Sequence, residues 1–232
     1  MDEHSSRPDP APSTSPQPLL ERVQRELQQE LLGKLLHDLR NPIHAIQISL
    51  ELFGRMARDP TNAKLRERAA AYVDPAEAAL ASLRMASARL TRYLSVPGAP
   101  KVAPLELDEL MSEVALLLRA SRRHMQVAYE PDGAGASISI EADATRLAHL
   151  LIHHCLGNAA SSVRFSVEGR PSDGVAINAR FDAAPSSAPE AGHRPVALTA
   201  RELKELVEAA GGKVARNDEA GFSLEFRRAG HH

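Results

Sequence analysis

Three polar side chains that could carry out phosphoryl or proton chemistry lie close together in the sequence, at His37, Asp38 and Asn41. An exposed neutral imidazole is a good nucleophile near pH 7. A carboxylate beside it can orient the ring and accept its proton, and an amide one helical turn away can position a water or a phosphoryl oxygen. A lone histidine is more often an ordinary surface residue, but this grouping predicts a displayed nucleophile.

A heptad pattern surrounds these residues and predicts the helix that holds them. The apolar positions alternate in steps of four and three: Leu32, Leu36, Leu39, Ile43, Ile46, Leu50, Phe53 and Ala57. Such a seam indicates a helix that packs against another helix. With Leu36 at position a, His37 falls at b, Asp38 at c and Asn41 at f, so all three should face away from the seam. Pro42 should bend the helix just after them.

The six residues from His37 to Pro42 read His-Asp-Leu-Arg-Asn-Pro. This run resembles the H-box of sensor histidine kinases. The resemblance implies that His37 is the phosphoacceptor, that Asp38 is the acid or base beside it, and that Asn41 helps to hydrolyse the phospho-aspartate of a partner. His44 lies one heptad later but has no acid after it, so we interpret it as a surface residue.

The composition limits the classes of protein that the chain can belong to. Its 232 residues suit one or two domains, and 3% aromatic residues with no Trp favour aliphatic and helical packing. A net charge of -2 gives no support for a nucleic-acid or anionic-membrane partner. The single cysteine, Cys155, excludes an internal disulfide and fits a reducing, cytoplasmic setting. No apolar run approaches the length of a membrane span, and we expect no metal site at His153-His154-Cys155.

The first half of the chain is predicted to be a helical hairpin after a disordered start. Residues 1–18 are rich in Pro and Ser and should be disordered. One long helix should run over 19–58, with a turn at 59–62, a helix over 63–72 and a fresh helix capped by Asp74. Two amphipathic helices leave half of a bundle uncovered, so a dimer forming a four-helix bundle is expected. We therefore assign 19–96 to a dimerisation and phosphotransfer domain.

The second half, residues 101–229, is predicted to be an α/β sandwich, which makes the chain α+β overall. A helix is expected over 107–118, a helix capped by Asp143 up to about 160, and a third opened by a capping box at Thr199. The expected strands are 126–129, 137–140, 163–167, 175–181, 213–216 and 222–226, with a polar loop over 182–197.

The order of these elements resembles the Bergerat-type ATP-binding domain of histidine kinases, so the resemblance covers roughly 19–229. It implies that Asn158 matches an asparagine that holds magnesium and that Asp182 matches the aspartate that binds adenine. His154 stands where a second asparagine is usual, and Ser161 where a lysine is usual. The two glycines expected after Asp182 are Ala184 and Ser186.

A second glycine-rich box of that family aligns with residues 197–200, and it has also lost its glycines. Glycine lets the backbone approach phosphates, so Cβ atoms at these positions obstruct a phosphate cradle. Magnesium depends on substrate phosphates and oxygen ligands, and Asn158 alone would hold it poorly. We therefore expect no cofactor, with Mg and ATP bound only if the alternative below holds.

The sequence leads to one preferred hypothesis and two others. The preferred hypothesis is a homodimeric histidine phosphotransferase of two-component type, which relays phosphoryl groups through His37 between aspartates of response-regulator receiver domains. The first alternative is an ATP-dependent histidine autokinase that uses Asn158 and Asp182. The second is a scaffold without phosphoryl chemistry, or a phosphatase that relies on Asn41.

Overall fold

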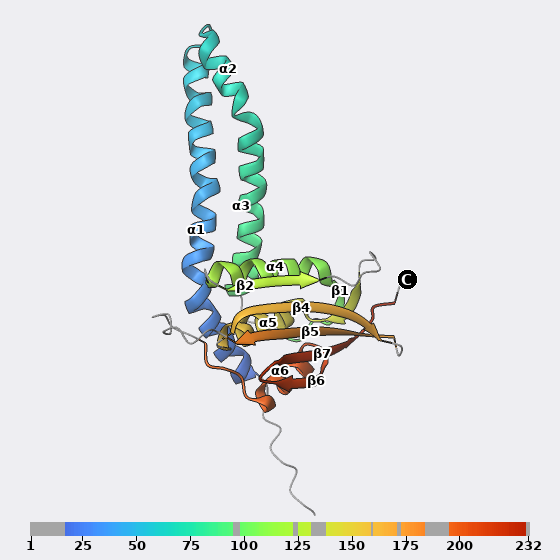
Figure 1. Cartoon of the computed structure of the whole chain (residues 1–232). Coiled ribbons are helices and arrows are strands. Elements are labelled where there is room, and N and C mark those ends of the chain that lie inside the picture. The colour runs from blue at the N-terminus through green and yellow to red at the C-terminus, as the bar shows by residue number, and fades with distance from the viewer. Residues whose placement is uncertain are drawn as a thin grey trace, which may run out of the picture.

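The N-terminal part of the chain forms a long helical hairpin that stands out from an α/β part in the computed structural model (Figure 1). The structure describes residues 17–94, 98–122, 125–130, 138–158, 160–170, 173–183 and 195–230. Helix α1 covers Gln17–Arg58, α2 covers Ala63–Ala71 and α3 covers Val73–Leu94. α1 passes through Pro42 as one helix, and the bend expected there does not interrupt it. Residues 17 and 18, predicted to be disordered, belong to α1, and the rest of that segment lies outside the described residues.

The hairpin buries a stripe of residues that differs from the predicted heptad seam. Beyond His37, the buried residues of the hairpin are Pro42 and Ser49 on α1, Ala69 on α2, and Ala79, Ala86 and Tyr93 on α3. Five of the eight predicted seam residues on α1 are instead exposed, namely Leu32, Leu36, Ile43, Leu50 and Ala57. The predicted seam is therefore divided. One side of it faces the interior of the hairpin, and the other side, which we call the exposed flank, is in contact with solvent.

The start of α3 corrects one predicted cap. The helix begins at Val73, so Asp74 lies in the first turn and is not the N-cap. The Ala76 N–H donates to the carbonyl of Tyr72 at 3.1 Å. Pro75 also falls in the first turn, where a backbone N–H has no helical acceptor, so the missing donor costs nothing there. The preceding turn forms as expected, and the Asn62 side chain caps α2.

The α/β part contains a mixed five-stranded sheet and a separate two-stranded sheet. Its elements in chain order are β1 (Ala103–Glu106), α4 (Leu107–Ser121), β2 (Gln126–Glu130), β3 (Ser139–Ala142), α5 (Ala144–Gly157), β4 (Ala160–Arg170), β5 (Gly174–Ala183), α6 (Ala200–Ala209), β6 (Lys213–Asp218) and β7 (Gly221–Arg227). The strand order is β2-β4-β5-β7-β6 in the large sheet, and β1 pairs with β3 in the small one. β2 and β4 run parallel, and the other neighbours run antiparallel.

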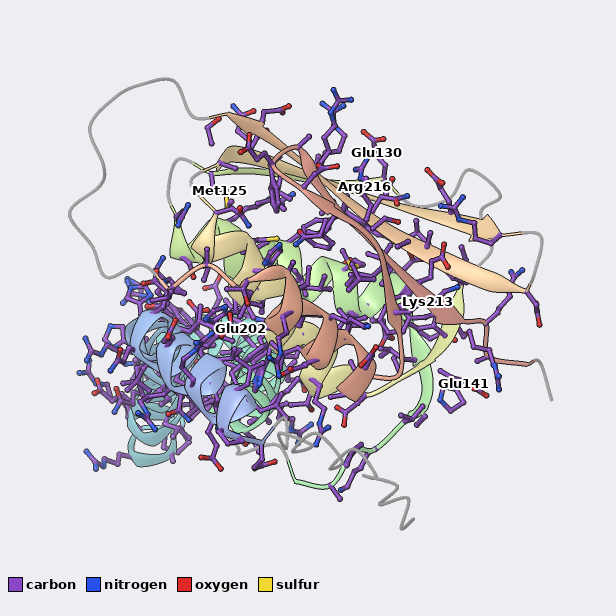
Figure 2. All side chains as sticks on the ribbon, turned by 90° about the horizontal axis from the view of Figure 1, so that it is seen from below. Met125, Glu130, Glu141, Glu202, Lys213 and Arg216 are labelled. Atoms are coloured by element: carbon purple, nitrogen blue, oxygen red, sulfur yellow. The ribbon has the colours of Figure 1, made fainter. Side chains whose placement is uncertain are left out.

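The large sheet is covered by helices on one face only, as the view from below shows (Figure 2). The strands alternate accordingly, since Val163, Phe165 and Val167 of β4 are buried while Arg164 and Glu168 are exposed. α4, α5 and α6 supply the apolar residues that complete the core on the covered face. The other face of the sheet is left polar.

Several element boundaries differ from the sequence prediction. α5 ends at Gly157 and not near residue 160, because β4 already begins at Ala160. β5 extends to Ala183, so Asp182 lies in a strand and not in the predicted loop. β1 was not predicted, and its pairing partner β3 covers Ser139–Ala142 instead of 137–140. The caps predicted at Asp143 and Thr199 are both confirmed.

The first half of α1 belongs to the same hydrophobic core as the α/β part. The buried residues of this stretch are Leu20, Val23, Leu27, Leu31 and Leu35. They pack with buried residues of α4 and α5, and the lower end of α1 lies beside α6 in Figure 1. His37 therefore comes just after the point where α1 leaves the α/β part.

Gly221, which opens β7, should be the glycine least tolerant of a side chain. It has φ of +150°, and a Cβ built on it would lie 2.0 Å from the carbonyl oxygen of Ala179. We expect Gly221→Ala to lower the free energy of unfolding by about 3 kcal/mol. Alanine is strained at this φ, and its Cβ would collide with the carbonyl oxygen of Ala179. Urea unfolding followed by circular dichroism measures this change.

The matched control is Gly54→Ala in α1, where a Cβ would meet no atom within 4 Å. Alanine is favoured over glycine in a helix by roughly 0.5–1 kcal/mol, so this variant should be as stable as the parent or slightly more. Equal unfolding midpoints for the two variants would contradict the prediction.

Candidate functional site

His37 lies on the solvent-facing side of α1, with its side chain 67% exposed. The side chain of Asp38 is also exposed, and its Oδ1 lies 3.9 Å from Nδ1 of His37. This distance is too long for a hydrogen bond but short enough for a small rotation to form one. Asn41 is exposed one turn further along the helix. The structure thus places all three predicted catalytic residues on one accessible surface of α1.

Pro42 alters the backbone beneath this surface. Since it has no N–H, it cannot donate to the carbonyl of Asp38, the residue four positions earlier. The Pro42 ring is buried in the hairpin while His37 points outward. The proline thus leaves a backbone acceptor without its helical donor directly beside the histidine.

The residue predicted to hold magnesium, Asn158, serves as the C-cap of α5. Its Nδ2 donates to the carbonyl of His154 at 2.7 Å, and its own carbonyl accepts from Nη1 of Arg122 at 2.9 Å. Arg122 also donates to the carbonyl of Leu156. The asparagine and the arginine therefore satisfy the carbonyls at the end of a buried helix, a structural role that needs no cation.

His154, which replaces a second asparagine in the resemblance, is a core residue. Its ring contacts Phe222 edge-on with a centroid distance of 5.1 Å and lies 6.2 Å from the ring of Phe181. Burial lowers the pKa of His154 to about 4. A neutral imidazole held between two phenylalanines fills apolar space and is not positioned as a magnesium ligand.

Asp182 lies at the end of β5 opposite Ser162 of β4. The Ser162 hydroxyl donates to its carboxylate at 2.5 Å. The carboxylate is exposed, so it does not sit in an enclosed adenine pocket. Ala184 and Ser186, which stand at the expected glycine positions, lie outside the described residues.

The region of the second glycine-rich box is closed by the chain's own carboxylates. The Thr199 N–H donates to Oε2 of Glu202 at 2.9 Å within a capping box at the start of α6. The Val196 N–H donates to Oε2 of Glu26 at 2.8 Å. Backbone N–H groups near a helix N-terminus are potential donors to a phosphate group. Two negative charges already occupy them, so the described residues do not fit a nucleotide triphosphate here.

A close backbone contact reinforces this closure. A Cβ added at Gly157 would lie 3.0 Å from Cα of Ala197, so the segment before α6 presses directly on the end of α5. The backbone at Ala197 is thus packed closely against the end of α5.

Sequence reasoning missed an ionic cluster that joins α1 to the α/β part. Arg22 Nη1 lies 2.8 Å from Oε1 of Glu202, and Nε2 of His153 lies 2.9 Å from Oε2 of Glu26. Burial raises the pKa of Glu26, but hydrogen bonds from Val196 and His153 and the charges of His153 and Arg22 outweigh it and leave that pKa below its ordinary value. The spacing of Arg22 and Glu26, one turn apart on α1, was the only local signal of this cluster.

Two further features are absent from the described residues. No group of three or more His, Cys, Asp or Glu among them could hold a metal ion, and Cys155 is buried. Within the same part of the chain, no helix combines the length and apolar character that a membrane crossing requires.

Comparisons with known proteins return similarity in structure alone. No protein-family model and no curated protein matches the sequence. The catalytic domain of histidine kinase ThkA is 19% identical over 54% of this chain and 93% of its own, with a TM-score of 0.40. Histidine kinase AdeS of Acinetobacter baumannii is 15% identical over 82% of this chain and 97% of its own, with a TM-score of 0.40. Full-length ShkA in complex with AMPPNP is 22% identical over 88% of this chain and 47% of its own, with a TM-score of 0.41. Function must therefore be argued from the residues of the site.

Proposed function

We propose that the chain is a histidine phosphotransferase of two-component type, in which His37 receives a phosphoryl group from an aspartate of one receiver domain and passes it to another. The observation that carries this proposal is the exposed imidazole of His37 beside Asp38 on a long helix. The contacts of Glu26 and Glu202 add support, because these carboxylates already accept from the amides of Val196 and Thr199, in and beside the segment that resembles the second glycine-rich box.

The transfer follows from the geometry of the pair. Asp38 lies on the Nδ1 side of His37, so it can accept the Nδ1 proton and leave the Nε2 lone pair pointing outward. Nε2 attacks the phosphorus of the phospho-aspartate, and the bond from phosphorus to the carboxylate oxygen breaks. The electron pair returns to that carboxylate, so the step is a reversible exchange that needs no nucleotide.

ATP-dependent autophosphorylation of His37 is the second candidate function. It is favoured by the position of Asp182. Asp182 pairs across the sheet with Ser162, and Ser162 lies four residues after Asn158 in the chain. The capping role of Asn158 and the closed amides of Val196 and Thr199 weigh against it.

Two parallel incubations separate the candidates. The full chain is mixed with labelled ATP and Mg²⁺ in one tube and with a phosphorylated receiver domain in another, and acid-labile label on the chain is measured. Label from the receiver alone supports the phosphotransferase. Label from ATP alone favours the autokinase, and label from neither favours a scaffold or a phosphatase that relies on Asn41.

We further propose that the hairpin dimerises into a four-helix bundle through its exposed flank. Leu36, Ile43 and Leu50 recur at heptad spacing on α1 and are exposed, and Leu80 is exposed on α3. Apolar residues at such spacing pack well only against other helices. A second copy would cover them while leaving His37, at position b, accessible.

The variant Ile43→Asp/Leu50→Asp should weaken dimerisation on the order of 100-fold, because each substitution removes buried apolar area and places a charge in the interface. Analytical ultracentrifugation over a range of concentrations measures this effect. Arg55→Asp, at position f on the opposite face of α1, is the matched control and should leave the association constant unchanged. A parent chain that sediments as a monomer at all concentrations would refute the dimer.

A further inference from the structure

The uncovered face of the five-stranded sheet carries a depression that takes no part in the chemistry described above. Its volume is about 540 Å³, and its lining residues come from β2, β4, β5, β6 and β7. Figure 2 shows two of them, Glu130 and Arg216, on the side of the strands away from the helices. His37 and Asn158 lie on other elements, and Asp182, which follows Arg180 by two residues on β5, is not among the residues that line the depression.

Arginines dominate the charge of this depression. Four of them line it, Arg164, Arg170, Arg180 and Arg216, against two carboxylates, Glu130 and Glu168. Arg164 pairs with Glu130 at 3.6 Å and Arg216 with Asp218 at 3.5 Å. Among the described residues, Arg180 forms no ion pair. The depression therefore has an excess of positive charge.

The pairing register makes this excess unfavourable for the empty sheet. Arg164 and Arg180 are direct partners across β4 and β5. Like charges at directly opposite positions of an antiparallel pair destabilise it. An anion between the two guanidiniums would turn this repulsion into two favourable contacts.

The floor of the depression carries an independent signal. Ser166, Asn178 and Ser223 are neighbours in one cross-strand row over β4, β5 and β7, and the row ends at Arg216 of β6. Ser223 is only 6% exposed, and its hydroxyl has no hydrogen-bond partner among the described residues. A buried hydroxyl without a partner is unfavourable, and Ser223 lines the depression, so a ligand bound there would supply the missing hydrogen bond.

We propose that this depression binds a small molecule that carries phosphate groups. Guanidinium groups bind phosphate oxygens through paired hydrogen bonds, which suits Arg180 and Arg216. The hydroxyls of Ser166 and Ser223 and the amide of Asn178 can donate to the same oxygens from below. A volume of about 540 Å³ lies within the usual range for small-ligand sites, which favours a small molecule over a protein segment.

Isothermal titration of the full chain with pyrophosphate at low salt tests the proposal. We expect saturable one-to-one binding that weakens as salt is added. Arg180→Gln and Arg216→Gln should each weaken it about 10-fold or more, since each removes a charged hydrogen bond, and Ser223→Ala should weaken it several-fold. Arg201→Gln, an exposed arginine on α6, is the matched control and should bind as the parent does.

Three outcomes would overturn the proposal. The first is no saturable binding of pyrophosphate to the parent chain. The second is unchanged affinity in Arg180→Gln, shown by circular dichroism to be folded. The third is a polyglutamate peptide that binds more tightly than pyrophosphate and is sensitive to the same substitutions, which would assign the face to an acidic protein segment.

Discussion

Replacing His37 with glutamine should abolish acceptance of a phosphoryl group from a phosphorylated receiver domain. Glutamine keeps the helix and places an amide near the position of the imidazole, but an amide nitrogen has no basic lone pair for attack on phosphorus. The side chain is exposed, so the substitution should leave the fold intact. Acid-labile label on the chain, measured over time, should fall to background.

The matched control is His44→Gln. His44 lies one heptad after His37 and is also exposed, but Ala45 follows it instead of an acid. This variant should accept label at the parent rate, because His37 is followed by a carboxylate that can orient its ring and His44 is not. Full labelling of the His37→Gln variant would show that another residue accepts the phosphoryl group, and it would refute the proposed function.

The local features of the fold could be predicted because they depend on residues close together in the sequence. The capping box of α6 needs only Thr199 and Glu202, and both of its hydrogen bonds are present. The Asp143 cap of α5 likewise forms within one turn, and its side chain accepts from the Arg146 N–H at 3.0 Å. Such hydrogen bonds join residues within one helical turn, so they can be predicted without knowing the tertiary packing.

The division of the heptad seam could not be predicted in the same way. A repeat of apolar residues shows that a helix is covered, but it does not say by which neighbour. In the hairpin, small residues such as Ala79 and Ala86 are buried, while the larger Leu80 is exposed. The apolar repeat in the sequence therefore includes residues of both kinds: those that pack within the chain and those on the exposed flank that we assign to a second copy.

The end of β5, which contains Asp182, was predicted to be a loop for a physical reason. β5 is covered on one face only, so its outer positions are polar, as at Asn178 and Arg180. Near the end of the strand this polarity continues into a segment rich in Pro, Ser and Ala, and the composition alone does not mark where pairing stops. The register with Ser162 decides it, and that pairing joins distant residues.

The ionic cluster between α1 and the α/β part could not be predicted from the sequence. Glu26 reaches His153 and the Val196 amide, which are more than a hundred positions away along the chain. Each of these residues is unremarkable in its own segment. Only the packing of the first half of α1 against α5 brings them together, and this packing also closes the nucleotide-like region.

The stability of the chain should fall steeply as the pH is lowered from 7 to 4, because α5 buries histidines that cannot charge easily. His149 packs against the ring of Tyr93 with a centroid distance of 5.5 Å, and His154 lies between Phe181 and Phe222. Burial lowers the pKa of both His149 and His154 to about 4. In the unfolded chain each imidazole has its ordinary pKa of about 6.5.

The sign of the effect follows from these two pKa values. Between about pH 6.5 and 4 the unfolded chain binds more protons than the folded one, so acid favours unfolding. The stabilisation is fully present above about pH 6.5 and is lost as the pH falls toward 4. One pKa unit corresponds to about 1.4 kcal/mol, so the two histidines together should lower the free energy of unfolding on the order of 5 kcal/mol. The lowered pKa values of Glu26 and Glu202 add a separate loss below their ordinary value of 4.5.

Urea unfolding at a series of pH values between 7 and 4.5 measures this slope above the range where the carboxylates titrate. His154→Phe keeps an aromatic ring in the Phe181–Phe222 cluster and removes one titrating group, so it should make the slope clearly smaller than in the parent. His44→Gln, which removes a histidine from the exposed surface of α1, should leave the slope as it is in the parent. A parent chain whose free energy of unfolding stays constant from pH 7 to 4.5 would show that these histidines reach solvent, and the packing of α5 against Tyr93 and Phe222 described above would be wrong.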